Sequence, residues 1–222
     1  MQDSPAVEPT PSTPSKTGRK NNPEKTRQAI LAAAVAEFAD LGLTGARVDA
    51  IAERTHTSKR MIYYYFGSKE GLYLAVLEKL YSNVRATEAQ LPLDSLPPLE
   101  AIRRLTEFTF EHHRSHDDFI RLVSIENIHR GHHLARSETI SSLNLSALQS
   151  IRRILERGEA NGEVRPGLDA VDVHLLISAF CFFRVSNRHT FGLIHRVDLD
   201  DEDSVRRHKA MIGDAVVGYL KP

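Results

Sequence analysis

Two short helical segments separated by only three residues constrain this chain more than any other feature. The first segment is RVDAIAER, and the second is SKRMIYYYF, which begins with Ser58, a residue type that caps helices. Only Thr55, His56 and Thr57 lie between them. Helices joined by so tight a turn cannot pack antiparallel, so they cross at a steep angle. Since Ala52 is small enough for close approach, the sequence predicts a helix-turn-helix.

A longer helix precedes this pair, in the stretch NPEKTRQAILAAAVAEFADLG. Asn22 is positioned to cap it, Pro23 suits its first turn, and Gly42 ends it. A fourth helix, capped by Ser68, is expected to follow the second short segment. Further helices are expected at about 98–115, 117–130, 136–160, 169–194 and 202–220. Because no segment alternates with the period of a strand, the sequence predicts an all-α chain with a three-helix head and a larger helical body.

The charges of this chain are unevenly distributed, although its net charge is zero. Residues 16–69 contain ten Lys or Arg and five Asp or Glu, whereas residues 70–222 are mildly acidic. A basic segment on an acidic body is typical of a protein that binds a polyanion. Four consecutive aromatic residues, Tyr63–Phe66, lie between Lys59-Arg60 and Lys69 in this segment. Rings beside cations near the start of a helix favour a nucleic-acid surface.

Residues 22–77 carry a dense pattern over about a quarter of the chain. Its elements are an alanine-rich first helix, Gly42, Val48, Ile51-Ala52, Tyr63, Phe66, Lys69 and Leu72. This pattern resembles the TetR family of bacterial transcriptional regulators. The resemblance implies a homodimer whose third helix enters the major groove, and which represses a nearby operon until a small ligand binds its C-terminal domain. The expected organisation is a disordered basic arm (1–21), a helix-turn-helix DNA-binding domain (22–68) and a helical effector-binding and dimerisation domain (69–222).

Nine residues are predicted to contact double-stranded DNA, because the start of a recognition helix faces base edges and phosphates. They are Arg47, Thr57, Ser58, Lys59, Arg60, Met61, Tyr63, Tyr64 and Lys69. Arg60 is suited to bind guanine in bidentate fashion. By the resemblance, Arg47 and Lys69 contact the phosphate backbone. Tyr65 and Phe66 are predicted to belong to the core instead.

Four positions depart from the pattern of the family, and one of them is Thr57, which stands near a position where a small apolar residue is usual. His56 stands where glycine is usual, and histidine tolerates a positive φ only at some cost. Arg60 replaces a common glycine, and Met61 replaces a common threonine. The base preference of relatives therefore does not carry over to this chain.

The helices at about 136–160 and 169–194 form the dimer interface by resemblance. Both have apolar stripes: Leu143, Ala147, Ile151, Ile154 and Leu155 on the first, and Leu176, Ala179, Phe180 and Phe183 on the second. A four-helix bundle across a two-fold axis would cover them. The alternative is that they pack the core of a single subunit.

An effector pocket is expected among the helices of about 98–130, roofed by later ones. Polar residues beside apolar ones are its candidates: His113, Glu126, His129, Arg130, Arg184 and Asn187. Aromatic walls with an arginine suit a small carboxylate or an oxidised heteroaromatic compound. The alternative is that these residues form structural ion pairs or lie on the surface.

Neither a metal nor a cofactor is predicted. The pairs His112/His116 and His129/His133 have a spacing that can bind zinc on a helix, but no cysteine joins either pair. The single cysteine, Cys181, and the absence of an apolar run long enough for a bilayer favour a cytoplasmic protein with no membrane partner, associated with the bacterial nucleoid when bound to DNA.

These features together predict a dimeric TetR-like repressor that binds a palindromic operator and is released by a small-molecule effector, with a catabolic operon as a candidate target. One alternative is a ligand-dependent activator of the same fold, and another is an interaction module that does not bind DNA. The chain is not expected to be an enzyme, because it has neither a phosphate-binding loop nor a set of nucleophile and base.

Overall fold

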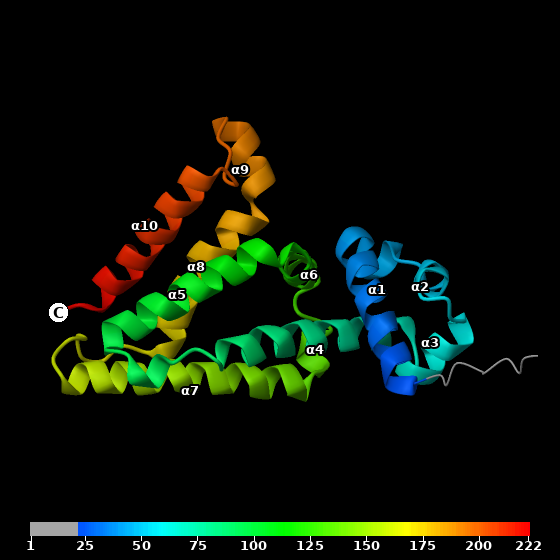
Figure 1. The fold of residues 1–222 in the computed structure, drawn as a ribbon, viewed down its shortest axis with the longest axis horizontal. Helices are drawn as coiled ribbons and strands as arrows, with labels where there is room; N and C mark the ends of the chain where they lie inside the picture. The colour runs from blue at the N-terminus through cyan, green and yellow to red at the C-terminus, as the bar shows by residue number, and fades with distance from the viewer. Residues whose placement is uncertain (1–21) are drawn as a thin grey trace, which may run out of the picture.

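The computed structural model describes residues 22–222, in which every regular element is helical (Figure 1). The arm predicted for residues 1–21 lies outside the described residues. The α-helices are α1 (Pro23–Gly45), α2 (Val48–Arg54), α3 (Lys59–Phe66), α4 (Lys69–Glu88), α5 (Pro98–Ser115), α6 (Asp117–Ile128), α7 (Glu138–Ala160), α8 (Ala170–Ser186), α9 (Arg188–His195) and α10 (Glu202–Leu220). Two short 3-10 helices, Leu93–Ser95 and Leu134–Arg136, lie between them. The prediction of an all-α chain is confirmed.

The helices of the head begin at the predicted caps. The side chain of Asn22 accepts hydrogen bonds from the amides of the first turn of α1, and Ser58 accepts one from the amide of Met61 in α3. Ser68 caps α4 in the same way. Gly42 interrupts α1 with a φ of 65°, so the regular helix ends there and a short turn continues to Gly45.

The core of the head includes residues of the body. Ile30, Phe38 and Ile62 are fully buried in it. The ring of Phe38 meets the ring of Tyr73 from α4 edge-to-face, with centroids 5.1 Å apart. Leu122 of α6 and Ile140 of α7 belong to the same cluster as the buried residues of α1–α4. In Figure 1, α4 runs from the head towards the body, and it therefore belongs to both.

The core of the body lies between α5, α7, α8 and α10. Its buried residues include Ile102, Phe110, Ile154, Ile177 and Val216. In Figure 1, α10 runs beside α5 and α8, with the C-terminus far from the head. These helices form the core of the body, which is joined to the head through α4, α6 and the start of α7.

The prediction of one continuous helix over 169–194 is wrong, because two helices, α8 and α9, cover this range. The chain leaves helical geometry at Asn187, where φ is −106° and ψ is 4°, and α8 and α9 are bent by 68°. Asparagine competes with the helix for local hydrogen bonds. Its carbonyl accepts from the amide of Phe191 at 2.8 Å, so Asn187 ends α8 and starts α9.

Helix α1 is long and apolar enough to cross a membrane by length and composition, as the bent α8–α9 pair would be if it formed one span. In the structure, Ile30, Ala34 and Phe38 of α1 are buried in the core of the head. Its apolar face is therefore covered by protein.

Candidate nucleic-acid interface and effector cavity

The turn between α2 and α3 holds the two helices in a defined crossing. His56 adopts the left-handed conformation with a φ of 50°, although it is not glycine. The amide of Thr57 donates to the carbonyl of Ala52 at 3.0 Å, and the hydroxyl of Thr55 donates to the carbonyl of Ile51 at 2.8 Å. These bonds join the turn to α2, so the turn fixes where α3 begins relative to α2.

Helix α3 is divided into a buried and an exposed face. Ile62 is fully buried, and Tyr65 and Phe66 pack against the core, as predicted. Lys59, Arg60 and Tyr64 are exposed, Tyr63 is at the boundary, and Thr57 and Met61 are half-buried. Tyr64 is 78% exposed, although its ring is large and mostly apolar. The predicted contacts on α3 therefore lie together on its solvent side.

Two lysines near the ends of α3, Lys59 and Lys69, contact neighbouring residues. The Lys59 ammonium lies 3.2 Å from the Asp49 carboxylate of α2. The Lys69 ammonium donates to the carbonyl of Thr44 at 3.3 Å, at the end of α1. Each contact is exposed, so solvent screening keeps it weak and a phosphate can replace it.

Arg47 is positioned by a residue that sequence reasoning missed. Its amide donates to a carboxylate oxygen of Glu37 at 2.9 Å, and Arg54 lies 3.3 Å from the other oxygen of that group. Glu37 is 97% removed from solvent, on the otherwise apolar inner side of α1. In the sequence, a glutamate among the apolar residues of this helix face could have indicated a buried carboxylate with partners elsewhere in the head. This contact fixes where α2 begins, with the side chain of Arg47 outside.

A cavity of about 380 Å³ lies in the body, where α4, α5, α6, α7 and α8 meet. Its walls are mostly apolar and aromatic, and include Tyr81, Phe119 and Phe182. The Tyr81 and Phe119 rings meet edge-to-face at 5.2 Å. Its ionisable lining, apart from Tyr81, comprises Arg85, Glu88, His113 and His174. Thr109, Asn127, Asn144 and Ser178 add neutral polar groups to the lining. A concave site that combines apolar walls with polar groups is typical of ligand pockets.

The charge in this cavity resides in one ion pair. Arg85 and Glu88, one turn apart on α4, form a salt bridge between side chains that are 16% and 11% exposed. Burial raises the pKa of Glu88, and Arg85 opposes that rise. Burial lowers the pKa of His113 to about 3, and the charges of His112 and Arg85 add to the effect. The pKa of His174 is also lowered by burial, so both histidines of the cavity are uncharged at neutral pH.

Of the six predicted effector residues, only His113 lines this cavity. Glu126 is 99% buried and bonds within the protein instead, since it accepts from Nδ1 of His133 at 2.8 Å and from two backbone amides. Burial opposes its ionisation, but the bonds from His133 and the amide of Leu134 keep the pKa of Glu126 below its usual value. His129 and Arg130 lie beyond the end of α6, and both are exposed.

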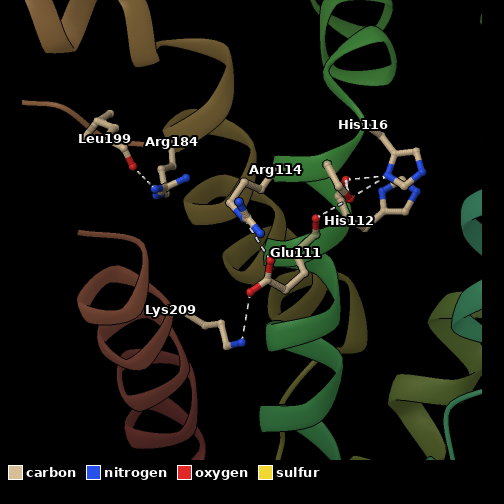
Figure 2. Close-up of polar contacts among 8 residues, drawn as sticks. Glu111, His112, Arg114, His116, Arg184, Leu199 and Lys209 are labelled. Carbon is tan, nitrogen blue, oxygen red and sulfur yellow. Dashed lines mark hydrogen bonds and ion pairs between the residues drawn. The ribbon is translucent and has the colours of Figure 1, made fainter. Parts of the chain in front are cut away.

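The other two predicted residues lie near α10 or at the end of α8. Arg184 stacks over Phe110, with 4.8 Å to the ring centroid, and donates to the carbonyl of Leu199 (Figure 2). In the same view, Glu111 of α5 bonds Lys209 of α10 at 3.0 Å. Asn187 ends α8. The structure therefore does not bring the six residues together, and it adds Arg85, Glu88 and His174 to His113. The sequence could have indicated this site, because Arg85 and Glu88 are one helical turn apart and follow the apolar residues Tyr81 and Val84.

The histidine pairs do not form a metal site with other ligands. The rings of His112 and His116 stack at 4.1 Å. The second pair is separated by the end of α6 and by the positive φ values of Arg130 and Gly131. Over residues 22–222, no group of three His, Cys, Asp or Glu is placed to hold a metal ion.

The prediction that the apolar stripe of α7 forms part of a dimer interface is wrong. Ala147, Ile151, Ile154 and Leu155 are buried within the subunit, so the alternative reading applies to them. On α8, Phe180 and Phe183 of the second predicted stripe are exposed, whereas Leu176 packs against the core of the body. Val171 and Leu175 of α8 and Met211 and Tyr219 of α10 are also exposed. A stripe buried inside one subunit is not available to another.

The chain matches two family descriptions. Residues 30–76 match "Bacterial regulatory proteins, tetR family", and residues 98–216 match "Tetracyclin repressor-like, C-terminal domain". The first match contains α2 and α3, and the second contains α5 to α8. Together the two matches include α3, whose solvent face carries the predicted DNA contacts, and most of the helices that line the cavity.

Individual proteins are similar over most of the chain. The HTH-type transcriptional repressor NicS of Pseudomonas putida is 37% identical over 207 residues, which cover 93% of this chain and 98% of that protein. The HTH-type transcriptional repressor SCO4008 of Streptomyces coelicolor is 29% identical over 74% of this chain and 80% of its own length. The crystal structure of another Streptomyces coelicolor regulator, SCO4942, superposes with a TM-score of 0.68 at 28% identity, covering 89% of this chain and 99% of that one. With matches that extend through both head and body, the chain belongs to the TetR family of bacterial regulatory proteins.

Proposed function

We propose that this protein is a dimeric transcriptional repressor that binds a palindromic operator through α3 and is released by a small molecule bound in the cavity between α4 and α8. The observation that carries the proposal is the solvent face of α3, where Lys59, Arg60 and Tyr64 are exposed on a helix anchored by Ile62. The name of its relative NicS, a transcriptional repressor, supports the direction of control. Such a protein acts on DNA in the cytoplasm.

In the proposed complex, α3 enters the major groove and different residues have different tasks. Arg60 reads a base, because a guanidinium can bind both acceptors of a guanine edge. Thr57, Ser58, Tyr63 and Tyr64 contact phosphate or sugar around it, with Met61 against apolar base surface. Arg47 and Lys69 bind the backbone on either side of α3, which fixes its orientation without reading sequence.

The proposed dimer uses α8 and α10. Their exposed residues Leu175, Phe183 and Met211 supply apolar surface that a second copy would cover. Two helices from each subunit make a four-helix bundle about a two-fold axis. A dimer is also what the function requires, since two recognition helices must reach successive major grooves, about 34–36 Å apart.

Effector release is proposed to act through α4 and α6, because each of these helices contacts both cavity and head. Helix α4 contributes Arg85 to the cavity and the buried Tyr73 to the core of the head. Helix α6 contributes Val123 to the cavity, while its Arg121 lies 3.2 Å from Asp40 of α1. A ligand that favours a shifted position of these helices changes the spacing of the two heads and so lowers operator affinity.

The test is selection of genomic fragments with the purified full-length protein, followed by footprinting at stated salt concentrations. A protected palindrome next to a promoter is the expected result, and the adjoining genes show whether a catabolic operon is controlled. A palindrome upstream of the promoter would make the protein an activator instead. If the folded dimer enriches no sequence at low salt, DNA binding is refuted and an interaction module becomes the better reading.

A further inference from the structure

The Arg85–Glu88 pair lies between two hollows. Both residues line the 380 Å³ cavity, and both also line a second hollow of about 560 Å³ between the end of α4 and α7. The second hollow is bordered by Leu143 and Arg153 of α7. The pair therefore stands where the cavity adjoins a second space, with room for either side chain to change its position.

Arg85 has donor capacity that the protein does not use. Within residues 22–222, the guanidinium of Arg85 donates one hydrogen bond, from Nη1 to the Glu88 carboxylate. Its Nε is buried and has no hydrogen-bond partner there. A guanidinium binds carboxylates best through two parallel N–H groups, and the edge formed by Nε and Nη2 offers such a pair. A buried donor without an acceptor is unfavourable, so a ligand that supplies one gains affinity.

The rest of the lining selects for an apolar body on the ligand. Val84, Leu105, Val123 and Phe182 are wall residues. Glu88 is the sole Asp or Glu of the lining and Arg85 its sole Lys or Arg. The cavity thus offers one cationic anchor and one carboxylate that competes for it, in a lining that also includes neutral polar side chains such as Thr109, Asn127 and Asn144.

We propose that the cavity binds a carboxylate with an apolar or aromatic body, which takes the free edge of Arg85 while Glu88 turns away towards the second hollow. This inference rests on the proposed function, in which the cavity holds the effector, and it names the chemical class of that effector. Arg85 is in the last turn of α4. The carboxylate therefore acts directly on the helix that reaches the head.

The experiment is isothermal titration of the full-length protein with three matched pairs of probes. The pairs are benzoate and benzamide, phenylacetate and phenylacetamide, and hexanoate and hexanamide. At least one carboxylate is expected to bind tenfold or more tightly than its amide. Arg85→Met should lower the affinity for that carboxylate at least tenfold, whereas Glu88→Gln should raise it several-fold by removing the competitor. A purely structural ion pair predicts that both variants weaken binding.

Arg114→Met is the matched control, because Arg114 forms an ion pair of the same i,i+3 spacing with Glu111, away from the cavity. It should bind the probes like the wild type. Circular dichroism checks that each variant is folded, and Arg85→Lys, which keeps the charge but loses the fork, should lie between wild type and Arg85→Met. Equal affinity for carboxylates and amides in all three pairs overturns the proposal, even if no variant folds.

Operator binding, measured separately by fluorescence anisotropy, distinguishes this failure from failure of the proposed function. A protein that binds its selected operator but does not prefer carboxylates refutes the ligand class alone. A protein that prefers carboxylates through Arg85 but binds no DNA refutes the proposed repressor and retains the binding site.

Discussion

A single buried carboxylate organises one side of the DNA-facing head. Glu37 of α1 is bonded to the amide of Arg47 and paired with Arg54, although the three residues are far from consecutive. Such a group must be satisfied within the protein, because burying an unpaired charge is costly. Its effect is to place the start of α2, and with it Arg47, at a fixed position beside α3.

Two substitutions at the residue scale separate reading from anchoring. Arg60→Ala should relax the preference for one base pair, a loss of about 1–3 kcal/mol of discrimination. Lys69→Ala should weaken binding to the operator and to unrelated DNA alike, and lower the salt dependence by about one phosphate contact. Fluorescence anisotropy on operator variants at several salt concentrations measures both effects.

The control for this pair is Arg152→Ala, which removes an exposed arginine from α7 in the body. It should leave both affinity and salt dependence unchanged. The assigned orientation of α3 would be wrong if Arg60→Ala weakened binding to every sequence equally and left base preference intact.

One histidine of the cavity, His113, makes the free energy of unfolding depend on pH. Burial depresses the pKa of His113 to about 3, so the folded protein keeps it neutral while the unfolded chain titrates near its ordinary value. Stability from this group is present above the unfolded pKa of about 6.5 and is lost as pH falls below it, at about 1 kcal/mol per pH unit. His113→Phe should make the decline between pH 6 and 4 shallower in urea unfolding. An unchanged slope would show that His113 titrates normally.

Local chemistry explains which residues could be predicted from the sequence. The caps Asn22, Ser58 and Ser68 were predictable, because a cap acts on amides two or three residues away. The positions of Glu37 and Arg85 were not, because their surroundings are assembled from helices distant in the chain. The sequence shows the charge of such a residue, but not which elements enclose it.

At the scale of elements, the spacing of apolar residues predicted where helices form. It predicted less well which surface each helix packs against. The stripe on α7 was visible, but an apolar stripe looks the same whether it packs inside one subunit or against another. The break at Asn187 was missed because neither proline nor glycine stands beside it, and apolar residues resume at Phe191. The bend between α8 and α9 depends on Asn187 and on how the chain after α9 packs.

The contact of α7 with the loop before α8 gives a prediction at this scale. A Cβ added to Gly158 would lie 2.4 Å from Cγ2 of Val164 and 3.0 Å from Cβ of Pro98, neither of which can swing away. Gly158→Ala should therefore destabilise the protein by about 1–3 kcal/mol, despite the better helix propensity of alanine. Urea unfolding at pH 7 measures the change.

Gly213→Ala on α10 is the matched comparison. There the added Cβ would meet Nη1 of Arg103 at 2.8 Å, the far end of a flexible side chain. Its cost should be much smaller, because the guanidinium can move and alanine favours the helix by roughly 0.5–1 kcal/mol. Equal losses at both glycines would contradict the packing described for Gly158.

The arrangement of the whole molecule predicts which face joins two copies. Phe183→Glu places a charge on the exposed apolar surface of α8, where Phe183 is 53% exposed. If two copies join through this face, as proposed, the variant should be a monomer at micromolar concentration and should lose tight operator binding. Sedimentation equilibrium measures the mass.

Leu145→Glu on α7 is the control, since Leu145 is 59% exposed but lies on the helix whose apolar stripe is internal. It should remain dimeric. The reverse outcome, a monomer from Leu145→Glu and a dimer from Phe183→Glu, would place the interface on α7 and overturn the assignment to α8 and α10.

The shared core of the head limits how such a regulator can be recombined. Leu122 and Ile140 come from the body yet fill the head beside Phe38 and Tyr73. A chimera that grafts residues 22–88 onto a foreign body would therefore leave apolar surface uncovered unless that body offers side chains of matching shape. The portable unit for exchanging operator specificity is thus smaller than a domain: the exposed face of α3 alone, from Thr57 to Tyr64.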